Sequence, residues 1–206
     1  MKQKLSILYK FIIVVVSFIG IYLNFKIAEP SKMILYFTII SNIMVFLFYG
    51  ISLILELLGK LKKGSKYYFI GGIVILFITL TMCVYEIALS DTAVYDGHLL
   101  ECNFVHLFTP ILTILDYFIF AEKGNIKKVY SVLWVIPLIS YALFVQIYSA
   151  LGGTFLDNQK FPYPFLDIEK NGLPYVLGVS TFFIVSFIGI GLIVYQIDKY
   201  LGKRDK

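Results

Sequence analysis

The stretch that decides the fold is MILYFTIISNIMVFLFYGISLIL, residues 33–55, in which 23 consecutive residues carry no charged side chain. A helix of about 20 apolar residues is long enough to cross the ~30 Å hydrocarbon core of a bilayer. Residues 33–55 therefore predict a membrane-spanning helix. The same stretch contains Thr38, Ser41 and Asn42, whose spacing of three and four positions places all three on one helix face.

Further uncharged stretches lie on both sides of this one, at residues 11–25, 67–85, 102–115, 129–156 and 171–197. The stretch 102–115 is short, but Leu99 and Leu100 before it and Tyr117 to Ala121 after it extend it to spanning length. The chain is 59% hydrophobic and 15% charged, which excludes a soluble domain of this size. We expect an all-α polytopic membrane protein, with a single six-helix transmembrane domain over residues 1–206.

The basic residues predict the orientation of these helices. Of the 18 Lys and Arg residues, 14 lie in the two termini and in the loops after the second and fourth helices. Because short cytoplasmic loops carry the Lys/Arg excess, both termini are expected in the cytoplasm. Reading residues 11–25 as a cleaved signal peptide would leave five crossings and put the two ends of the mature chain on opposite sides, against this charge pattern.

The net charge of +5 thus reports topology, and loops this short do not indicate nucleic-acid binding. Lysines in the loop after the second helix suit contact with anionic lipid headgroups: Lys60, Lys62, Lys63 and Lys66. The opposite, outer side carries an acidic rim with no Lys or Arg in it: Glu86, Asp91, Asp96, His98 and Glu101. Such a rim is ordinary solvated loop charge, a means of attracting cations, or a means of orienting a catalytic group.

Two further features lie toward the outer side. Cys83 and Cys102 are near the outer face, where they are either free thiols or a disulfide. The one sizeable loop, about Gly152 to Leu173, separates the last two helices, because its prolines and glycines break any continuous helix.

The fourth helix carries an unusual polar stripe around His106. Its members share one face at offsets of three, four and seven positions: Cys102, Asn103, Thr109, Pro110 and Thr113. Pro110 has no N–H to donate to the carbonyl of His106, so we expect the helix to be kinked at the histidine. Asp116, ten residues further on, is expected to be a structural residue near the inner end.

Thr38 and His106 lie at comparable depths in the predicted bundle. Thr38 is five residues inside the outer end of its helix and His106 seven, which corresponds to about 8 to 11 Å at ~1.5 Å per residue. A hydroxyl becomes an effective nucleophile when a neighbouring base takes its proton, and histidine suits that task. The two residues therefore predict a nucleophile and its general base.

The run Tyr36-Phe37-Thr38-Ile39-Ile40-Ser41-Asn42 resembles the second helix of the androgen-induced family of six-pass membrane proteins, in its bacterial-type members. His106 with Pro110 and Asp116 resembles the family's fourth-helix pattern. Tyr163-Pro164-Phe165-Leu166-Asp167 resembles its last outer-loop motif. The three short motifs occur in the family's order and together extend over most of the chain.

The resemblance implies an intramembrane hydrolase of lipid esters, such as fatty acid esters of hydroxy fatty acids, in a bacterial cell membrane. It implies Thr38 and His106 as the catalytic residues. The polar neighbours on the same two helices are predicted to contact substrate: Ser41, Asn42, Asn103 and Thr109. For Ser41 and Asn42 the alternative is that they bond backbone carbonyls or join helices. The expected partners are the lipid ester and membrane lipids, and no cofactor is expected.

Two alternatives remain open at this point. One is a non-catalytic transporter of small molecules or ions, or a lipid-binding membrane protein, although no internal repeat of the transporter kind is found between the two halves of the chain. The other is a metal site built from His98, Glu101, Cys102 and His106. Glu101 points about 140° away from His106 around a helix, which disfavours a site on that helix alone. The oligomeric state is not indicated.

Overall fold

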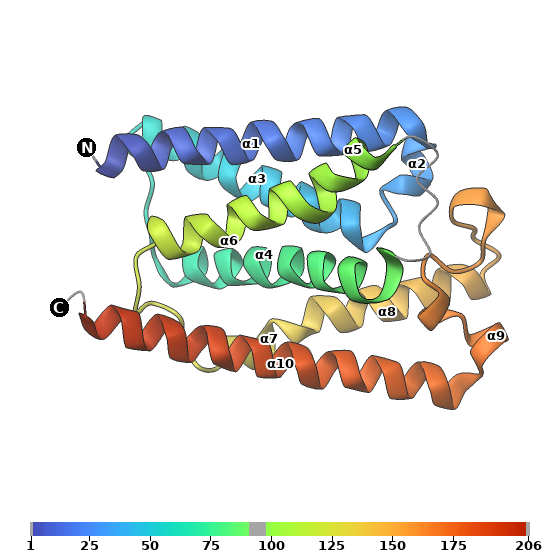
Figure 1. The fold of residues 1–206 in the computed structure, drawn as a ribbon. Helices are drawn as coiled ribbons and strands as arrows, with labels where there is room; N and C mark the ends of the chain where they lie inside the picture. Colours follow the sequence, from blue (N-terminus) through green and yellow to red (C-terminus); the bar gives the residue numbers. More distant parts are fainter. Residues whose placement is uncertain (1, 91–97, 205–206) are drawn as a thin grey trace. The chain divides into compact units, whose positions relative to one another are not determined.

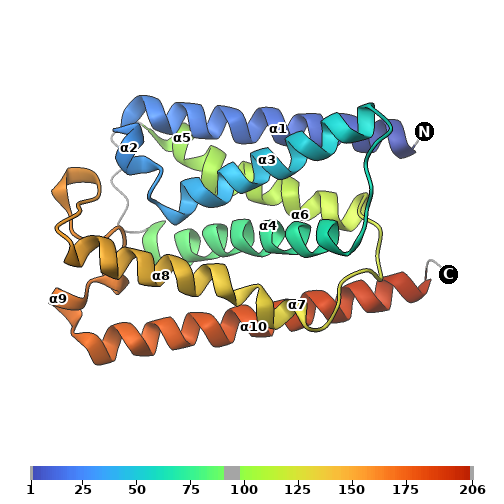
Figure 2. The same cartoon turned by 180° about the vertical axis from the view of Figure 1, so that it is seen from behind.

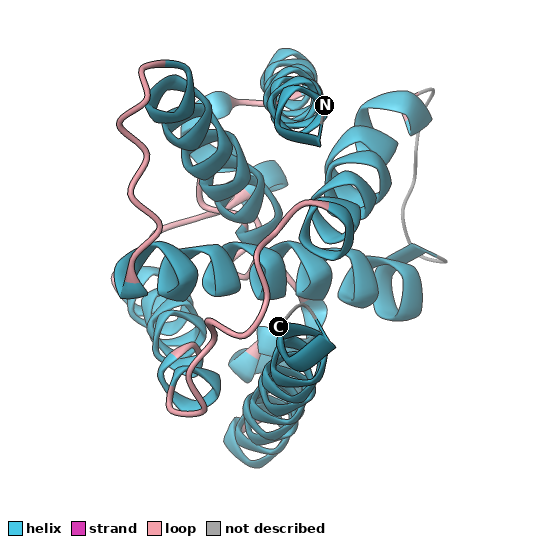
Figure 3. Cartoon of the chain, turned by 90° about the vertical axis from the view of Figure 1, so that its left-hand side faces the viewer, coloured by secondary structure: helices cyan, strands magenta, loops and turns pink. Residues whose placement is uncertain are grey.

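The computed structural model describes residues 2–90 and 98–204. Within these ranges every regular element is a helix and no strand occurs (Figures 1 and 3). Six helices are long and apolar enough to cross a membrane: Gln3–Ile27, Phe37–Leu57, Ser65–Leu89, Leu99–Ile119, Tyr130–Ala150 and Leu173–Lys203. The predicted all-α class with six spanning helices is confirmed, including the short fourth one. These helices indicate an integral membrane protein.

The chain packs as two compact units, and unit 1 comprises Met1–Pro30 and Phe37–Glu122. It contains α1 (Lys2–Ile27), α3 (Phe37–Leu57) and α4 (Ser65–Val84), which continues into the π-helical turn η1 (Tyr85–Leu89). Its last span is made of three consecutive pieces: α5 (Leu99–Asn103), the π-helical turn η3 (Phe104–Phe108) and α6 (Thr109–Ile119). The spanning helices form because no water is present in the hydrocarbon region, so each backbone polar group needs a partner within the protein.

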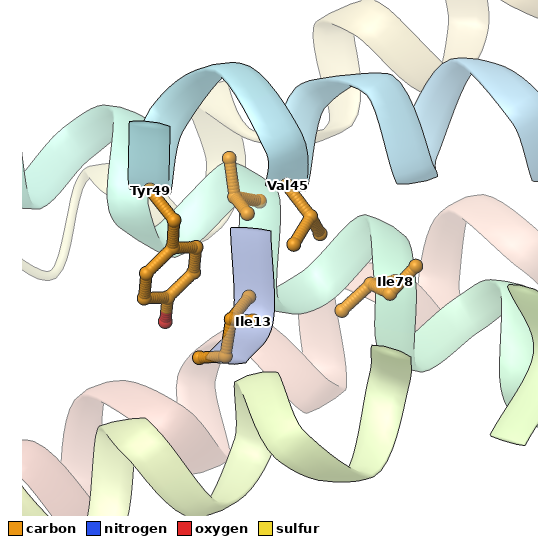
Figure 4. Close-up of a cluster of buried hydrophobic side chains, with 5 residues drawn as sticks. Ile13, Val45, Tyr49 and Ile78 are labelled. Carbon is orange, nitrogen blue, oxygen red and sulfur yellow. The ribbon is translucent and has the colours of Figure 1, made fainter. Parts of the chain in front are cut away.

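Unit 1 is held together by a cluster of apolar side chains from three helices. Ile13 of α1, Val45 and Tyr49 of α3, and Val74 and Ile78 of α4 are each at most 3% exposed (Figure 4). Lipid tails are as apolar as these side chains, so close packing and hydrogen bonding rather than hydrophobicity hold such helices together. The cluster fixes α3 beside α1 and α4, and α3 carries Thr38.

Unit 2 comprises Ser31–Tyr36 and Lys123–Lys206, and α2 (Pro30–Met33) lies where the chain passes between the units. Its spanning helices are α7 (Tyr130–Leu133) with α8 (Val135–Ala150), and α10 (Leu173–Arg204). Figure 2 shows α7 and α8 running beside α10, which both of them contact. The loop between α8 and α10 holds only short helices: η4 (Leu156–Asn158), η5 (Pro164–Leu166) and α9 (Ile168–Asn171).

The fifth span differs in detail from the uncharged stretch 129–156. It is interrupted at Trp134, because Pro137 has no N–H for the carbonyl of Leu133 four residues earlier. It ends at Ala150, where Gly152 adopts φ +86° and the N–H of Gly153 bonds to the carbonyl of Tyr148 at 2.9 Å. This glycine turn closes the helix.

The loop that follows packs on itself within unit 2. Phe155, Phe161 and Leu166 form a buried cluster with Val145 of α8. The hydroxyl of Tyr36 accepts a hydrogen bond from the N–H of Leu156 at 3.3 Å. Burial raises the pKa of Tyr36 to about 12, so this hydroxyl stays protonated at neutral pH.

Candidate functional site

Thr38 is the second residue of α3 and lies in the first turn of that helix. Its Oγ1 is 3.3 Å from Nε2 of His106, which belongs to the fourth span of the same unit. Both side chains are half-buried, so they keep some accessible surface. The expectation that these two residues lie within hydrogen-bond reach is confirmed. Their catalytic roles stay a prediction.

The other nitrogen of the His106 ring fixes which nitrogen carries the proton. Nδ1 lies 3.1 Å from the carbonyl oxygen of Cys102 and 3.2 Å from the Cys102 Sγ. Because a carbonyl only accepts, the neutral ring donates Nδ1–H to it. Nε2 is then the unprotonated nitrogen, and it accepts a hydrogen bond from the Thr38 hydroxyl. The hydrogen-bond network thus assigns the tautomer that a general base requires.

His106 lies in the π-helical turn η3 rather than in a simple kink. The N–H of Thr109 bonds to the carbonyl of Phe104, five residues earlier, and Pro110 follows without an N–H of its own. The expected disturbance of the helix at the histidine is therefore present, and its form is a register shift. Such π-helical turns are rare and occur frequently at functional sites.

A second π-helical turn, η1, contributes a residue that the sequence reasoning missed. Tyr85 is 6% exposed, and its ring stacks on the His106 ring with centroids 3.9 Å apart and planes 18° apart. The stacked Tyr85 limits the rotation of the imidazole. Its position four residues after Thr81, on the same helix face, is the one signal for it in the sequence.

Ser41 and Asn42 are both 0% exposed, and each forms hydrogen bonds to other groups of the protein. Ser41 Oγ is 2.9 Å from the carbonyl oxygen of Thr38 and 2.8 Å from the hydroxyl of Thr81. The Asn42 amide nitrogen donates to the carbonyls of Thr38 at 2.8 Å and of Val105 at 3.0 Å. Both residues thus support the backbone around Thr38. Their predicted contact with substrate stays a prediction.

The remaining predicted substrate contacts lie on the same span as His106. Asn103 is half-buried and precedes η3. Thr109 is 0% exposed, and its Oγ1 has no hydrogen-bond partner among the described residues. Thr113, one turn further on, donates to the carbonyl of Thr109 at 2.8 Å. Of this polar stripe, His106 is the member that reaches Thr38.

Toward the end of unit 1 that carries Lys10, two buried polar pairs accompany the site. The Tyr49 hydroxyl donates to Asp116 at 3.0 Å, in agreement with a structural role for this aspartate. Lys10 of α1 forms an ion pair with Glu56 of α3, and their side chains are 5% and 11% exposed. Sequence reasoning assigned Lys10 to the cytoplasmic terminus and missed this pair.

At the start of the fourth span, Nδ1 of His98 lies 3.4 Å from Glu101 Oε1, and Glu86 is exposed. Asp91 and Asp96 of the predicted acidic rim lie outside the described residues. Cys83 and Cys102 are free thiols. In the part of the chain that the structure describes, no three His, Cys, Asp or Glu side chains gather as metal ligands.

The site is therefore a threonine and a histidine in hydrogen-bond contact, with the histidine tautomer set by a backbone carbonyl and its ring held by a tyrosine. Comparison of the chain with models of protein families, with curated proteins and with solved structures finds no match.

Proposed function

We propose that this protein is an intramembrane hydrolase of lipid esters that uses Thr38 as nucleophile and His106 as general base. The observation that carries the proposal is the 3.3 Å contact between Thr38 Oγ1 and His106 Nε2, with Nδ1 bonded to the carbonyl of Cys102. A nucleophile, a base and a group that orients the base are the three parts of a covalent hydrolytic site.

In the proposed reaction Thr38 Oγ1 attacks the ester carbonyl and gives its proton to Nε2 of His106. The tetrahedral intermediate collapses with loss of the alcohol, which takes the proton from Nε2, and the acyl group remains on Thr38. Water, deprotonated by Nε2, then attacks the acyl-enzyme and releases the fatty acid while Thr38 regains its proton. No cofactor enters these steps.

The position of Thr38 in the first turn of α3 also favours this chemistry. The first N–H groups of a helix have no acceptor within the helix, and the positive end of the helix dipole is located there. Negative charge that develops on the carbonyl oxygen of a substrate held at Thr38 is therefore stabilised at this helix end.

The location of both residues in apolar spanning helices favours a substrate that partitions into the membrane. The resemblance of the Thr38 and His106 segments to the androgen-induced family extends the proposal to fatty acid esters of hydroxy fatty acids. Because the resemblance is to bacterial-type members of that family, the proposal also places the protein in a bacterial cell membrane. A transporter is less well supported, because three carboxylates in the spanning helices are engaged by protein groups: Glu56 by Lys10, Asp116 by Tyr49 and Asp198 by the N–H of Ile126.

The proposal is tested with the protein purified into lipid nanodiscs and a long-chain ester of a hydroxy fatty acid. Thr38→Val removes the hydroxyl at nearly constant volume and should abolish release of fatty acid. Thr79→Val is the matched control, because the Thr79 hydroxyl donates only to the carbonyl of Ile75 in its own helix, at 2.7 Å. Equal turnover by wild type and Thr38→Val would refute the assignment.

The proposal includes the orientation with both termini in the cytoplasm, which rests on the Lys/Arg excess in the termini and in two alternate loops. Lys62, Lys127 and Lys160 are exposed in the structure. In a chain without Cys83 and Cys102, cysteines at Lys62 and Lys127 should resist an impermeant thiol reagent in intact cells, while one at Lys160 should react. The reverse pattern would invert the topology.

A further inference from the structure

Asn42 is fully buried and is bonded to the backbone of two helices, which is not required of a residue that only binds substrate. It is 0% exposed, and its amide nitrogen bridges two backbone carbonyls, that of Thr38 on its own helix and that of Val105 on the fourth span. Thr38 is the proposed nucleophile, and Val105 directly precedes the proposed base. One side chain therefore joins the two backbone segments that carry the reacting groups.

The carbonyl of Val105 needs an external donor because of the local sequence. In an α-helix it would accept from Thr109, but the N–H of Thr109 bonds to Phe104 in the π-helical register. In that register the donor would be residue 110, which is a proline without an N–H. Val105 is itself 0% exposed, and a carbonyl without a donor is strongly disfavoured in a membrane interior, where no water can replace the donor. Asn42 supplies the missing donor.

Asn24 of α1 makes the same two kinds of bond without touching the proposed site. Its amide nitrogen donates to the carbonyl of Gly20 at 2.8 Å and to that of Glu101 at 3.0 Å. It is 7% exposed, so it resembles Asn42 in burial as well. Glu101 lies five residues before His106, more than one helical turn away. Asn24 is therefore a control for the loss of an amide that bridges two helices at a point more than one turn away from His106.

We infer that Asn42 is a positioning residue, whose amide replaces the donor that η3 and Pro110 withhold from Val105 and thereby holds His106 at Thr38. This inference rests on the proposed function for its catalytic meaning. It differs from the substrate contact predicted for Asn42 from the sequence. Loss of the amide lets the backbone around Val105 move and separates Thr38 Oγ1 from His106 Nε2, while the ester-binding surface is unchanged.

The contact can be observed without any assay of activity, because the chain contains only two histidines. With ¹⁵N-labelled histidine and His98→Gln, one imidazole remains, and Thr38→Val defines the Nε2 resonance of His106 without its hydroxyl partner. Asn42→Ala, and Asn42→Leu, which keeps the volume, should both move the resonance most of the way to that value. Asn24→Ala should leave it at the wild-type position. Folded Asn42 variants with an unchanged resonance would overturn the inference.

The kinetic test separates this inference from the proposed function. Asn42→Leu should lower kcat by about 100-fold, as expected for misplaced reacting groups, with KM little changed. A rise in KM at constant kcat, or a loss of turnover with an unmoved resonance, would instead identify direct contact with substrate and overturn positioning. If the wild type hydrolyses no ester, the proposed function fails, and the resonance still decides whether Asn42 holds His106 at Thr38.

Pro110→Ala keeps the test decisive if the Asn42 variants do not fold. This change restores an N–H at residue 110, which can donate to the carbonyl of Val105 in place of Asn42. Asn42→Ala should then be recovered as folded protein in the Pro110→Ala background, at a yield near that of Pro110→Ala alone. Failure to fold in both backgrounds would show that Asn42 is needed for some other reason and would overturn the inference.

Discussion

Thr38 Oγ1 lies 3.3 Å from Nε2 of His106, although the two residues are 68 positions apart in the chain. The contact has a direction, because the opposite ring nitrogen donates to the carbonyl of Cys102 at 3.1 Å and leaves Nε2 as the acceptor. The backbone therefore performs the orienting task that a carboxylate performs in the serine triads. No side-chain carboxylate takes part in this contact.

The first prediction concerns the nucleophile. Thr38→Ala and His106→Ala should each lower turnover of a long-chain ester by about 10³-fold or more, because the covalent route is lost. Stability should change little, since a hydrogen bond between membrane helices contributes only about 1 kcal/mol. Thr38→Ser should retain measurable turnover because the hydroxyl survives. Fatty acid release and thermal unfolding, measured on the same samples, provide the test.

A covalent probe gives an independent readout for the same residue. A fluorophosphonate should label the wild type at Thr38, with loss of fluoride, and should not label Thr38→Ala. Peptide mapping of the labelled protein identifies the modified side chain. Labelling that persists in Thr38→Ala would place the nucleophile elsewhere, and unfolding of both Ala variants would make the two residues structural.

The second prediction separates the carbonyl of Cys102 from its thiol, since both lie near Nδ1 of His106. Cys102→Ala removes the thiol and keeps the carbonyl. If the carbonyl orients the ring, turnover should stay within about threefold of wild type, equivalent to roughly 0.6 kcal/mol. A loss of 100-fold or more, in a variant that is still folded, would mean that the thiol is required.

The meeting of Thr38 and His106 was predictable because the helical rise is constant, so residue counts from the adjacent ends of the two spans give comparable depths. Rotation of each helix about its axis was not predictable in the same way. The π-helical turn at Phe104–Phe108 adds one residue to a turn and changes which side chains face α3. Pro110 signals a disturbance there but does not specify its register.

Tyr85 and Lys10 show two further limits of the sequence. The stacking of Tyr85 on His106 depends on how two helices are rotated against each other, and the π-helical turn η1 that begins at Tyr85 has no proline or glycine signal in the sequence. Lys10 reads as one more cytoplasmic lysine, because charge counting assigns residues to loops and cannot detect a partner 46 positions away. Pairing between helices is a property of packing, which composition does not encode.

The third prediction follows from the pair of Lys10 and Glu56, whose side chains are 5% and 11% exposed. Lys10→Met or Glu56→Gln alone removes one charge and leaves the other buried, which should lower the free energy of unfolding by about 3–5 kcal/mol. The double variant Lys10→Met with Glu56→Leu should recover most of this loss. Thermal unfolding of the three variants in one detergent tests it, and additive losses in the double variant would show that the two charges are not coupled.

The last prediction concerns a close approach of two backbones in unit 2. A Cβ on Gly202 of α10 would lie 2.5 Å from Cα and 2.6 Å from N of Gly124, whose φ of +81° suits glycine. Backbone atoms cannot give way as a side chain does, so Gly202→Ala should displace the loop and lower the free energy of unfolding by about 1–3 kcal/mol.

A Cβ on Gly189, in the same helix, would meet no atom within 4 Å, so Gly189→Ala should be neutral or stabilising by up to about 1 kcal/mol. Differential scanning fluorimetry of the two variants should show a lower unfolding temperature for Gly202→Ala, and equal temperatures would mean that the loop does not pack on α10 as described.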